Sequence, residues 1–324
     1  MDIILKVLLP LLVAGGILWW MYRGFTWNQV VETLRTDMRW EWMLLSFPFG
    51  ISAQVFRALR WRQALRPLGE SPRLKTCVNA VFLSYASSLV IPRVGEVLRC
   101  GVLSRYEGTN FSKAVGAVVT ERVLDMSVVF LFSMLTLLAQ IPVFMRFFAE
   151  TGFSLGDFLQ TFTSTGYLVT ALCLVLLGIM AVLIIRRLDV FSRTRSVMND
   201  FMAGIVSIRK VDNPWLFIFN TLGIWVSYYL HFYLTFYCFG FTEHLGAVAA
   251  LVAFVVGCFA VLVPTPNGAG PWHFAVKTAL VLYGVAATDA AVFVLVVHTT
   301  QTLLVALLGI YALVALFLTK PRKV

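Results

Sequence analysis

Two apolar segments of this 324-residue chain are interrupted by turns that carry proline and glycine. The first covers residues 79–105 and breaks at Ile91-Pro92-Arg93-Val94-Gly95-Glu96. The second covers residues 248–284 and breaks at Pro264-Thr265-Pro266-Asn267-Gly268-Ala269-Gly270. Non-helical backbone at membrane depth persists only inside protein or beside a water-filled cavity. In a membrane protein, a pair of such interruptions indicates where a ligand binds.

The composition is that of an integral membrane protein. Hydrophobic residues make up 60% of the chain, charged residues 13%, and the mean hydropathy is +0.85. A soluble globular domain has about 25% charged residues. The net charge of +10 does not indicate nucleic acid as a partner, because the basic residues flank apolar segments, as membrane topology requires.

Six segments are long enough to cross about 30 Å of hydrocarbon, which takes about 20 helical residues. They are residues 3–22, 40–58, 112–139, 165–185, 214–240 and 288–318.

Loop charge sets the orientation of these segments. Residues 57–75 hold six Lys or Arg, residues 186–210 hold six, and the tail after residue 318 holds three. The positive-inside rule places all three stretches in the cytoplasm. Residues 76–105 must then enter and leave on the inner face, and residues 246–285 on the outer face.

The sequence therefore predicts an all-α, single polytopic membrane domain over residues 1–324, with both termini inside. It has six full spans and two re-entrant hairpins that enter from opposite faces, about residues 76–105 and 246–285. A long helical segment follows each hairpin, which is the outline of an inverted repeat. We expect a multi-pass protein of the bacterial cytoplasmic membrane.

Charged residues inside spans are costly, at roughly 2.5–3.5 kcal/mol each on insertion scales. Glu121, Arg122 and Asp125 lie in the first half of the third span. Glu121 and Asp125 are four residues apart and repel each other unless a cation lies between them. The cluster is either the polar wall of a substrate path or proton site, or a structural ion pair between helices.

Arg93, Glu96 and Arg99 surround the first break. A helix that begins near Gly95 directs free N–H groups and its positive dipole end at the turn. With Arg93 beside that end, the turn is suited to a phosphate head group. The alternative is a cytoplasmic loop whose arginines contact lipid phosphates without specificity.

The second break has a similar design. Asn267, Gly268 and Gly270 permit unusual backbone angles, and His273 and Lys277 follow four residues apart. These residues form a second candidate site, or a tight turn with an interfacial histidine.

Motifs for catalysis are absent from the sequence: there is no phosphate-binding loop of the GxxxxGK[ST] type, no HExxH and no GxSxG. The five cysteines are scattered, with no CxxC pair. We expect neither an enzyme nor a metal or other cofactor.

Three motifs together resemble the flippase-like transmembrane domain of bacterial lysylphosphatidylglycerol synthases and its free-standing relatives. They are Pro92-Arg93-Val94-Gly95-Glu96-Val97-Leu98-Arg99, then Ser112-Lys113-Ala114 with Glu121-Arg122-Val123-Leu124-Asp125, then residues 264–270. The resemblance covers nearly the whole chain and implies a lipid translocation role. Asn267 and His273 stand where the family commonly has glycine and glutamate, which argues against a cationic aminoacyl head group. The family's soluble aminoacyl-transferase domain is missing, so we do not expect this chain to make an aminoacylated lipid.

The leading hypothesis is a flippase for a phospholipid or polyprenyl-linked lipid with an anionic, phosphate-bearing head group. In it, Arg93, Arg99, His273 and Lys277 gather the phosphate, while Glu121, Arg122 and Asp125 form a gating or proton-coupling network. Two alternatives stay open: a proton-coupled transporter of a small soluble anion, and a non-transporting membrane partner of a lipid-modifying or glycosyl-transferring enzyme. The sequence also leaves open a homo-oligomer.

Overall fold

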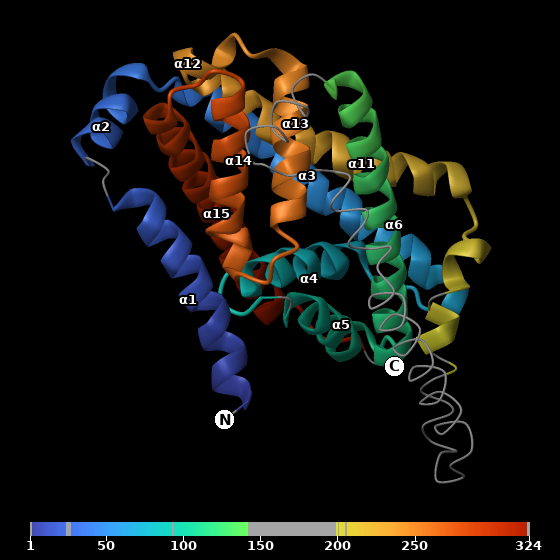
Figure 1. Ribbon diagram of the computed structural model, residues 1–324. Helices are drawn as coiled ribbons and strands as arrows, with labels where there is room; N and C mark the ends of the chain where they lie inside the picture. The colour runs from blue at the N-terminus through green and yellow to red at the C-terminus, as the bar shows by residue number, and fades with distance from the viewer. Residues whose placement is uncertain are drawn as a thin grey trace, which may run out of the picture. The chain divides into compact units, whose positions relative to one another are not determined.

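The computed structural model describes residues 2–23, 27–92, 94–141, 199, 201–204 and 206–322. The chain divides into two compact units, Met1–Thr136 with Asp200–Val324, and Leu137–Asn199. Nearly all of the second unit lies outside the described residues, and the described helices belong almost wholly to the first unit (Figure 1).

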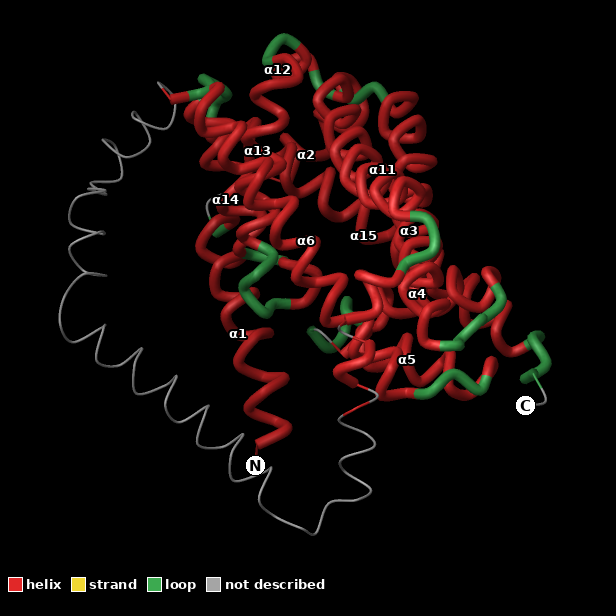
Figure 2. Tube along the Cα trace, turned by 90° about the vertical axis from the view of Figure 1, so that its right-hand side faces the viewer, coloured by secondary structure: helices red, strands yellow, loops and turns green. Residues whose placement is uncertain are grey.

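The described part of the chain consists of helices joined by loops and contains no strand, as the sequence predicts (Figure 2). Short 3₁₀ or π turns join some of them, at Thr33–Asp37, Arg66–Leu68, Ser207–Lys210, Leu234–Cys238 and Pro266–Gly268. The helices are α1 (Asp2–Tyr22), α2 (Trp27–Glu32), α3 (Trp40–Leu65), α4 (Leu74–Ser87), α5 (Val94–Glu107), α6 (Phe111–Ala139), α11 (Pro214–Tyr233), α12 (Gly240–Glu243), α13 (Gly246–Ala260), α14 (Pro271–Leu282) and α15 (Ala287–Phe317).

Five of the six expected spans overlap helices α1, α3, α6, α11 and α15, although α3 continues to Leu65 and α11 ends at Tyr233. The sixth, residues 165–185, lies outside the described residues. Within the described part, α15 is the one helix whose length and apolar composition both suffice for a membrane crossing. Helices α3 and α6 have 26 and 29 residues, but charged side chains interrupt their apolar character.

The first break separates α4 from α5, which lie side by side (Figures 1 and 2). Gly95 is what lets them approach, because a Cβ there would overlap the backbone carbonyl of Ser84. At the other end of the pair, Glu107 accepts hydrogen bonds from the Arg73 Nε, at 2.7 Å, and from the Thr76 hydroxyl. Arg73 also donates to the backbone carbonyl of Lys320, at 3.1 Å. The ends of α4 and α5 far from the break are therefore fixed to each other and to the C-terminal residues.

The second break separates α13 from α14, which also pack against each other. Gly257 allows this contact, since a Cβ there would lie 2.8 Å from the indole nitrogen of Trp272. The four helices of the two hairpins have 14, 14, 15 and 12 residues, each shorter than a full membrane span.

Two hydrophobic cores surround the hairpins. The α4–α5 core includes Trp61, Val81 and Leu103, and the α13–α14 core includes Phe236 and Val276. Helices α3 and α15 contribute to both cores, through Met43 and Trp61 for α3, and Phe293 and Leu316 for α15.

Helix α11 packs along α3 at two close approaches. A Cβ at Gly50 would lie 2.9 Å from the His231 ring, and one at Gly223 would lie 2.9 Å from the Phe56 ring. Helices α3, α11 and α15 thus form the frame on which both hairpins are held.

The order of elements repeats along the chain. The hairpin α4–α5 precedes the 29-residue α6, and the hairpin α13–α14 precedes the 31-residue α15. This order matches the layout from which the sequence predicts an inverted repeat; the orientation of the hairpins in a bilayer stays a prediction.

We predict that Gly95→Ala destabilises the α4–α5 hairpin by about 1–3 kcal/mol, the usual cost of overpacking. The measurement is the thermal unfolding midpoint of the detergent-purified protein. Gly101→Ala in the same helix is the matched control, because a Cβ there meets nothing within 4 Å. Equal midpoints for the two variants would contradict the close approach at Gly95.

Candidate functional site

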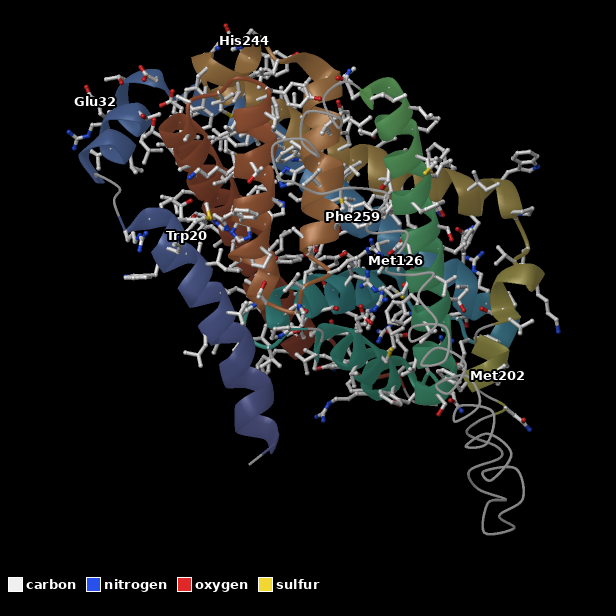
Figure 3. The ribbon with its side chains drawn as sticks, in the orientation of Figure 1. Trp20, Glu32, Met126, Met202, His244 and Phe259 are labelled. Atoms are coloured by element: carbon white, nitrogen blue, oxygen red, sulfur yellow. The ribbon has the colours of Figure 1, made fainter. Side chains whose placement is uncertain are left out.

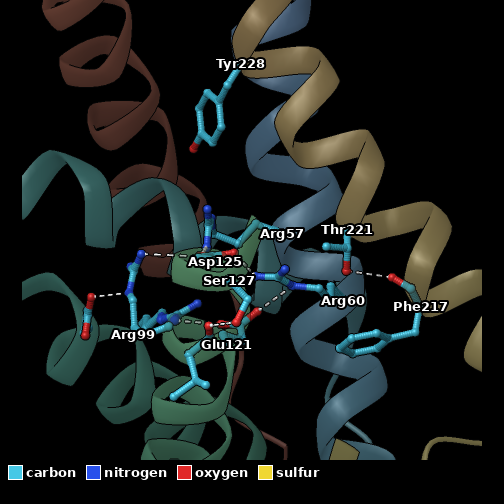
Figure 4. A network of polar contacts seen from close by, with 12 residues as sticks. Arg57, Arg60, Arg99, Glu121, Asp125, Ser127, Phe217, Thr221 and Tyr228 are labelled. Carbon is cyan, nitrogen blue, oxygen red and sulfur yellow. Dashed lines mark hydrogen bonds and ion pairs between the residues drawn. The ribbon is translucent and has the colours of Figure 1, made fainter. Parts of the chain in front are cut away.

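Seven charged side chains from α3, α5 and α6 converge through ion pairs. Figure 4 labels the five that are buried, Arg57, Arg60, Arg99, Glu121 and Asp125. We call all seven the arginine–carboxylate network. Its members are Arg57 and Arg60 of α3, Glu96 and Arg99 of α5, and Glu121, Arg122 and Asp125 of α6.

Arg60 lies between the two carboxylates of α6. Its Nη2 is 2.7 Å from Asp125 Oδ1, and its Nε is 3.5 Å from Glu121 Oε1. The sequence required a cation between Glu121 and Asp125, and the structure identifies it. Because Arg60 comes from another helix, the same contact that offsets the repulsion also joins α3 to α6.

Each of these carboxylates has a second arginine. Arg57 Nη1 is 2.5 Å from Asp125 Oδ2, and Arg99 Nη2 is 2.7 Å from Glu121 Oε2. The five side chains are at most 8% exposed, so they form a buried group of fixed charges. Removing one partner from such a group leaves the other unpaired in a medium of low dielectric constant.

Glu96 and Arg122 form the outer end of the network. Arg122 Nε is 2.5 Å from Glu96 Oε1. The Arg122 side chain is 38% exposed and the Glu96 side chain 35%. Arg122 also reaches inward, with Nη1 3.5 Å from Asp125 Oδ2. It thus connects the exposed pair to the buried group.

Aromatic side chains border the buried arginines. The Arg99 guanidinium lies 4.6 Å from the centre of the Trp61 ring, and that of Arg57 lies 6.0 Å from the Tyr85 ring. The Tyr228 hydroxyl donates to the Tyr85 hydroxyl at 2.9 Å, which links α11 to α4 beside Arg57. These contacts stabilise the cations without neutralising them.

The network holds more positive than negative charge: four arginines face three carboxylates. Among the described residues, no acceptor is present for four N–H donors of its buried guanidinium groups, at Arg57 Nε, Arg60 Nη1, and Nε and Nη1 of Arg99. Unsatisfied buried donors are costly, and an anion with several oxygens would satisfy them. Chemically, the site is suited to bind a phosphate or a similar group.

Two of the residues that the sequence places at the first break find their partners on α6. Glu96 and Arg99 pair with Arg122 and Glu121 of α6 rather than with each other. Arg93, which the sequence places at the same turn, lies outside the described residues.

Assigning Arg57 and Arg60 to a cytoplasmic loop was wrong. Both lie in α3, which continues to Leu65, and both are buried in the network. Residues 57–75 therefore retain four loop or helix-end cations rather than six, namely Arg62, Arg66, Arg73 and Lys75. The available signal was their spacing of three residues within the apolar run Phe56-Arg57-Ala58-Leu59-Arg60-Trp61, which indicates one helical face.

The second break forms a separate polar group, which we call the histidine cluster: Asn267, His273, His298 and Thr302. Asn267 Nδ2 donates to the Thr302 hydroxyl at 2.6 Å, and His298 Nε2 lies 3.1 Å from the Asn267 carbonyl oxygen. The rings of His273 and His298 are 4.4 Å apart between centroids. Hydrogen bonds and a ring contact hold the histidine cluster together, whereas ion pairs hold the arginine–carboxylate network together.

Backbone geometry explains the residues at this break. Asn267, Gly268 and Gly270 have φ of 51°, 72° and 87°, a region that favours glycine and asparagine. The Gly270 N–H donates to His273 Nδ1 at 3.4 Å, so His273 caps the start of its own helix. Lys277 is half-buried and makes no hydrogen bond or ion pair with any described residue.

The two groups are separate networks of polar contacts in the part of the chain that the structure describes. Among the described residues, no hydrogen bond or ion pair joins the histidine cluster to the arginine–carboxylate network. Nor does this part of the chain bring together three or more His, Cys, Asp or Glu side chains in the way a metal site requires.

We predict that Arg60→Met destabilises the protein by about 3–5 kcal/mol, because it leaves two buried carboxylates short of a partner. Arg66→Met is the matched control, since Arg66 is exposed in the turn that directly follows α3. Thermal unfolding of both purified variants measures the difference. Similar midpoints would show that Arg60 does not hold α3 to α6.

Comparison with known proteins supports the family resemblance that the three sequence motifs indicate. Searches of curated proteins and of solved structures returned no significant match. A family model described as the lysylphosphatidylglycerol synthase TM region matches residues 7–309. This range includes every member of the network and of the histidine cluster. Because the match extends over nearly the whole chain, the chain belongs to the lysylphosphatidylglycerol synthase TM region family of membrane proteins.

Proposed function

We propose that this protein is a lipid flippase, which moves a phosphate-bearing polar head group across the bacterial cytoplasmic membrane while the acyl or prenyl tails stay in the lipid. Membership of a family related to lipid handling supports this role. The proposal involves no covalent chemistry, so the protein acts as a translocator and not as an enzyme.

The observation that carries the proposal is the set of buried guanidinium N–H donors without acceptors on Arg57, Arg60 and Arg99. A phosphate has enough oxygens to accept from several of them at once. Glu121 and Asp125 hold the arginines in place, so that little reorganisation is needed when the phosphate arrives. The negative charge of a phosphate would offset the excess of one positive charge in the network.

We further propose that the two hairpins re-enter the bilayer from opposite faces. The 12- to 15-residue lengths of α4, α5, α13 and α14 support this, being too short for a span but sufficient for a re-entrant arm. In this arrangement the network provides the charged site. The histidine cluster, with neutral polar groups, lets a head group pass without trapping it.

A small soluble anion is the rival substrate, because the same unsatisfied donors would bind it. A protein that carries inorganic phosphate but no lipid into vesicles would favour that rival. A protein that carries neither would fit a membrane partner of a lipid-modifying or glycosyl-transferring enzyme.

We predict that Arg99→Lys and Glu121→Gln each lower lipid transport at least tenfold. Arg99→Lys keeps the charge but removes the planar set of donors, and a lysine cannot replace the paired geometry. Glu121→Gln removes a negative charge that faces two arginines. The measurement is translocation of an acyl-labelled fluorescent phospholipid or a polyprenyl-phosphate analogue in proteoliposomes.

Arg66→Lys and Glu70→Gln are the matched controls, since both residues lie outside the network. Each variant is compared at equal reconstituted amount and with its thermal midpoint recorded, which separates lost transport from lost folding. Wild-type transport by folded Arg99→Lys protein would contradict the site.

A further inference from the structure

A groove of about 610 Å³ runs along one face of α6 beside the network. This volume lies within the range of small-molecule sites, about 300–1,000 Å³. Its long wall is apolar and exposed, and Figure 3 marks one of its residues, Met126. The apolar lining consists of Val119, Val123, Met126 and Phe130.

Two charged residues interrupt the apolar lining of the groove. Glu96 and Arg122, the half-exposed pair of the network, both line it. A groove that combines a charge pair with an apolar wall offers both kinds of contact that a phospholipid can make, through its charged head group and through its hydrocarbon chain. In a bilayer the acyl chain comes from an equally apolar medium, so the wall favours it through packing contacts and not through removal of the chain from water.

The balance of charge selects among head groups. An anionic head group that displaced Glu96 from Arg122 would leave the carboxylate without a partner, and a purely cationic one would leave Arg122 held by Asp125 alone. A head group that carries both a phosphate and an ammonium replaces one ion pair by two. No charge is then left unpaired at a site where screening by water is incomplete.

We propose that this groove binds a zwitterionic aminophospholipid, with its phosphate on Arg122, its ammonium on Glu96 and an acyl chain along Val123, Met126 and Phe130. This inference rests on the proposed function and names the substrate class and its docking site. Arg122 then has a second role. Because it also contacts Asp125, a phosphate held by Arg122 lies next to the buried donors of the network.

The test is a binding measurement on the full chain in detergent, with phosphatidylethanolamine and phosphatidylglycerol of identical acyl chains. We expect about tenfold tighter binding of phosphatidylethanolamine, as one additional charge-assisted hydrogen bond provides. Glu96→Gln should remove the preference by weakening binding of phosphatidylethanolamine and not of phosphatidylglycerol. Val123→Trp should weaken binding of both lipids, because it fills the apolar wall.

Leu135→Trp is the matched control on α6, being similarly exposed but outside the groove lining, and should leave both affinities unchanged. Equal binding of the two lipids by the wild-type protein would overturn the head-group assignment. Binding that Val123→Trp does not change would overturn the groove as a lipid site. If Val123→Trp instead changed the oligomeric state of the protein, the groove would be occupied by a second copy of the chain and the lipid assignment would be overturned.

Transport separates this inference from the proposed function. A protein that binds phosphatidylethanolamine through Glu96 but moves no lipid retains the inference and contradicts the flippase. A protein that moves both acyl-labelled lipids at equal rates, and binds them equally, retains the flippase and contradicts the inference.

Discussion

The ion pairs that Arg60 makes with two carboxylates of α6 are the interaction on which the described structure depends most. Charges this deeply buried are tolerated only when their partners surround them. Here the partners come from three helices, so satisfying the charges also fixes α3, α5 and α6 relative to one another. The position of the first hairpin results from this, because α5 carries Arg99 into the group.

Much of the fold could be predicted from residue types alone. Pro92 at one break, and Pro264 to Gly270 at the other, mark places where a helix is interrupted, and each is followed by a new helix in the structure. The need for a cation beside Glu121 and Asp125 could be predicted, because two carboxylates four residues apart on one helical face repel each other without one. The partners of these charges were harder to find, since pairing between helices depends on tertiary contacts that no local spacing encodes.

Arg57 and Arg60 illustrate that limit. Further basic residues, Arg62 and Arg66, follow them closely in the sequence. The sequence alone therefore does not separate the buried arginines from those at the end of the helix. What distinguishes them is the continuation of α3 to Leu65, which turns both side chains into the protein. His273 illustrates the opposite case, in which a residue expected to bind a ligand has a structural role. It follows a break, but its ring caps its own helix and contacts the ring of His298 in α15.

Helix α15 has a consequence for biosynthesis. It contributes Phe293 to one core and Leu316 to the other, and between them Gly309 fits against Ala86 of α4 so closely that a Cβ would overlap it. All other helices of both cores precede α15 in the chain. Neither core is therefore complete when those helices leave the ribosome, and both cores acquire their final packing only after α15 has been synthesised.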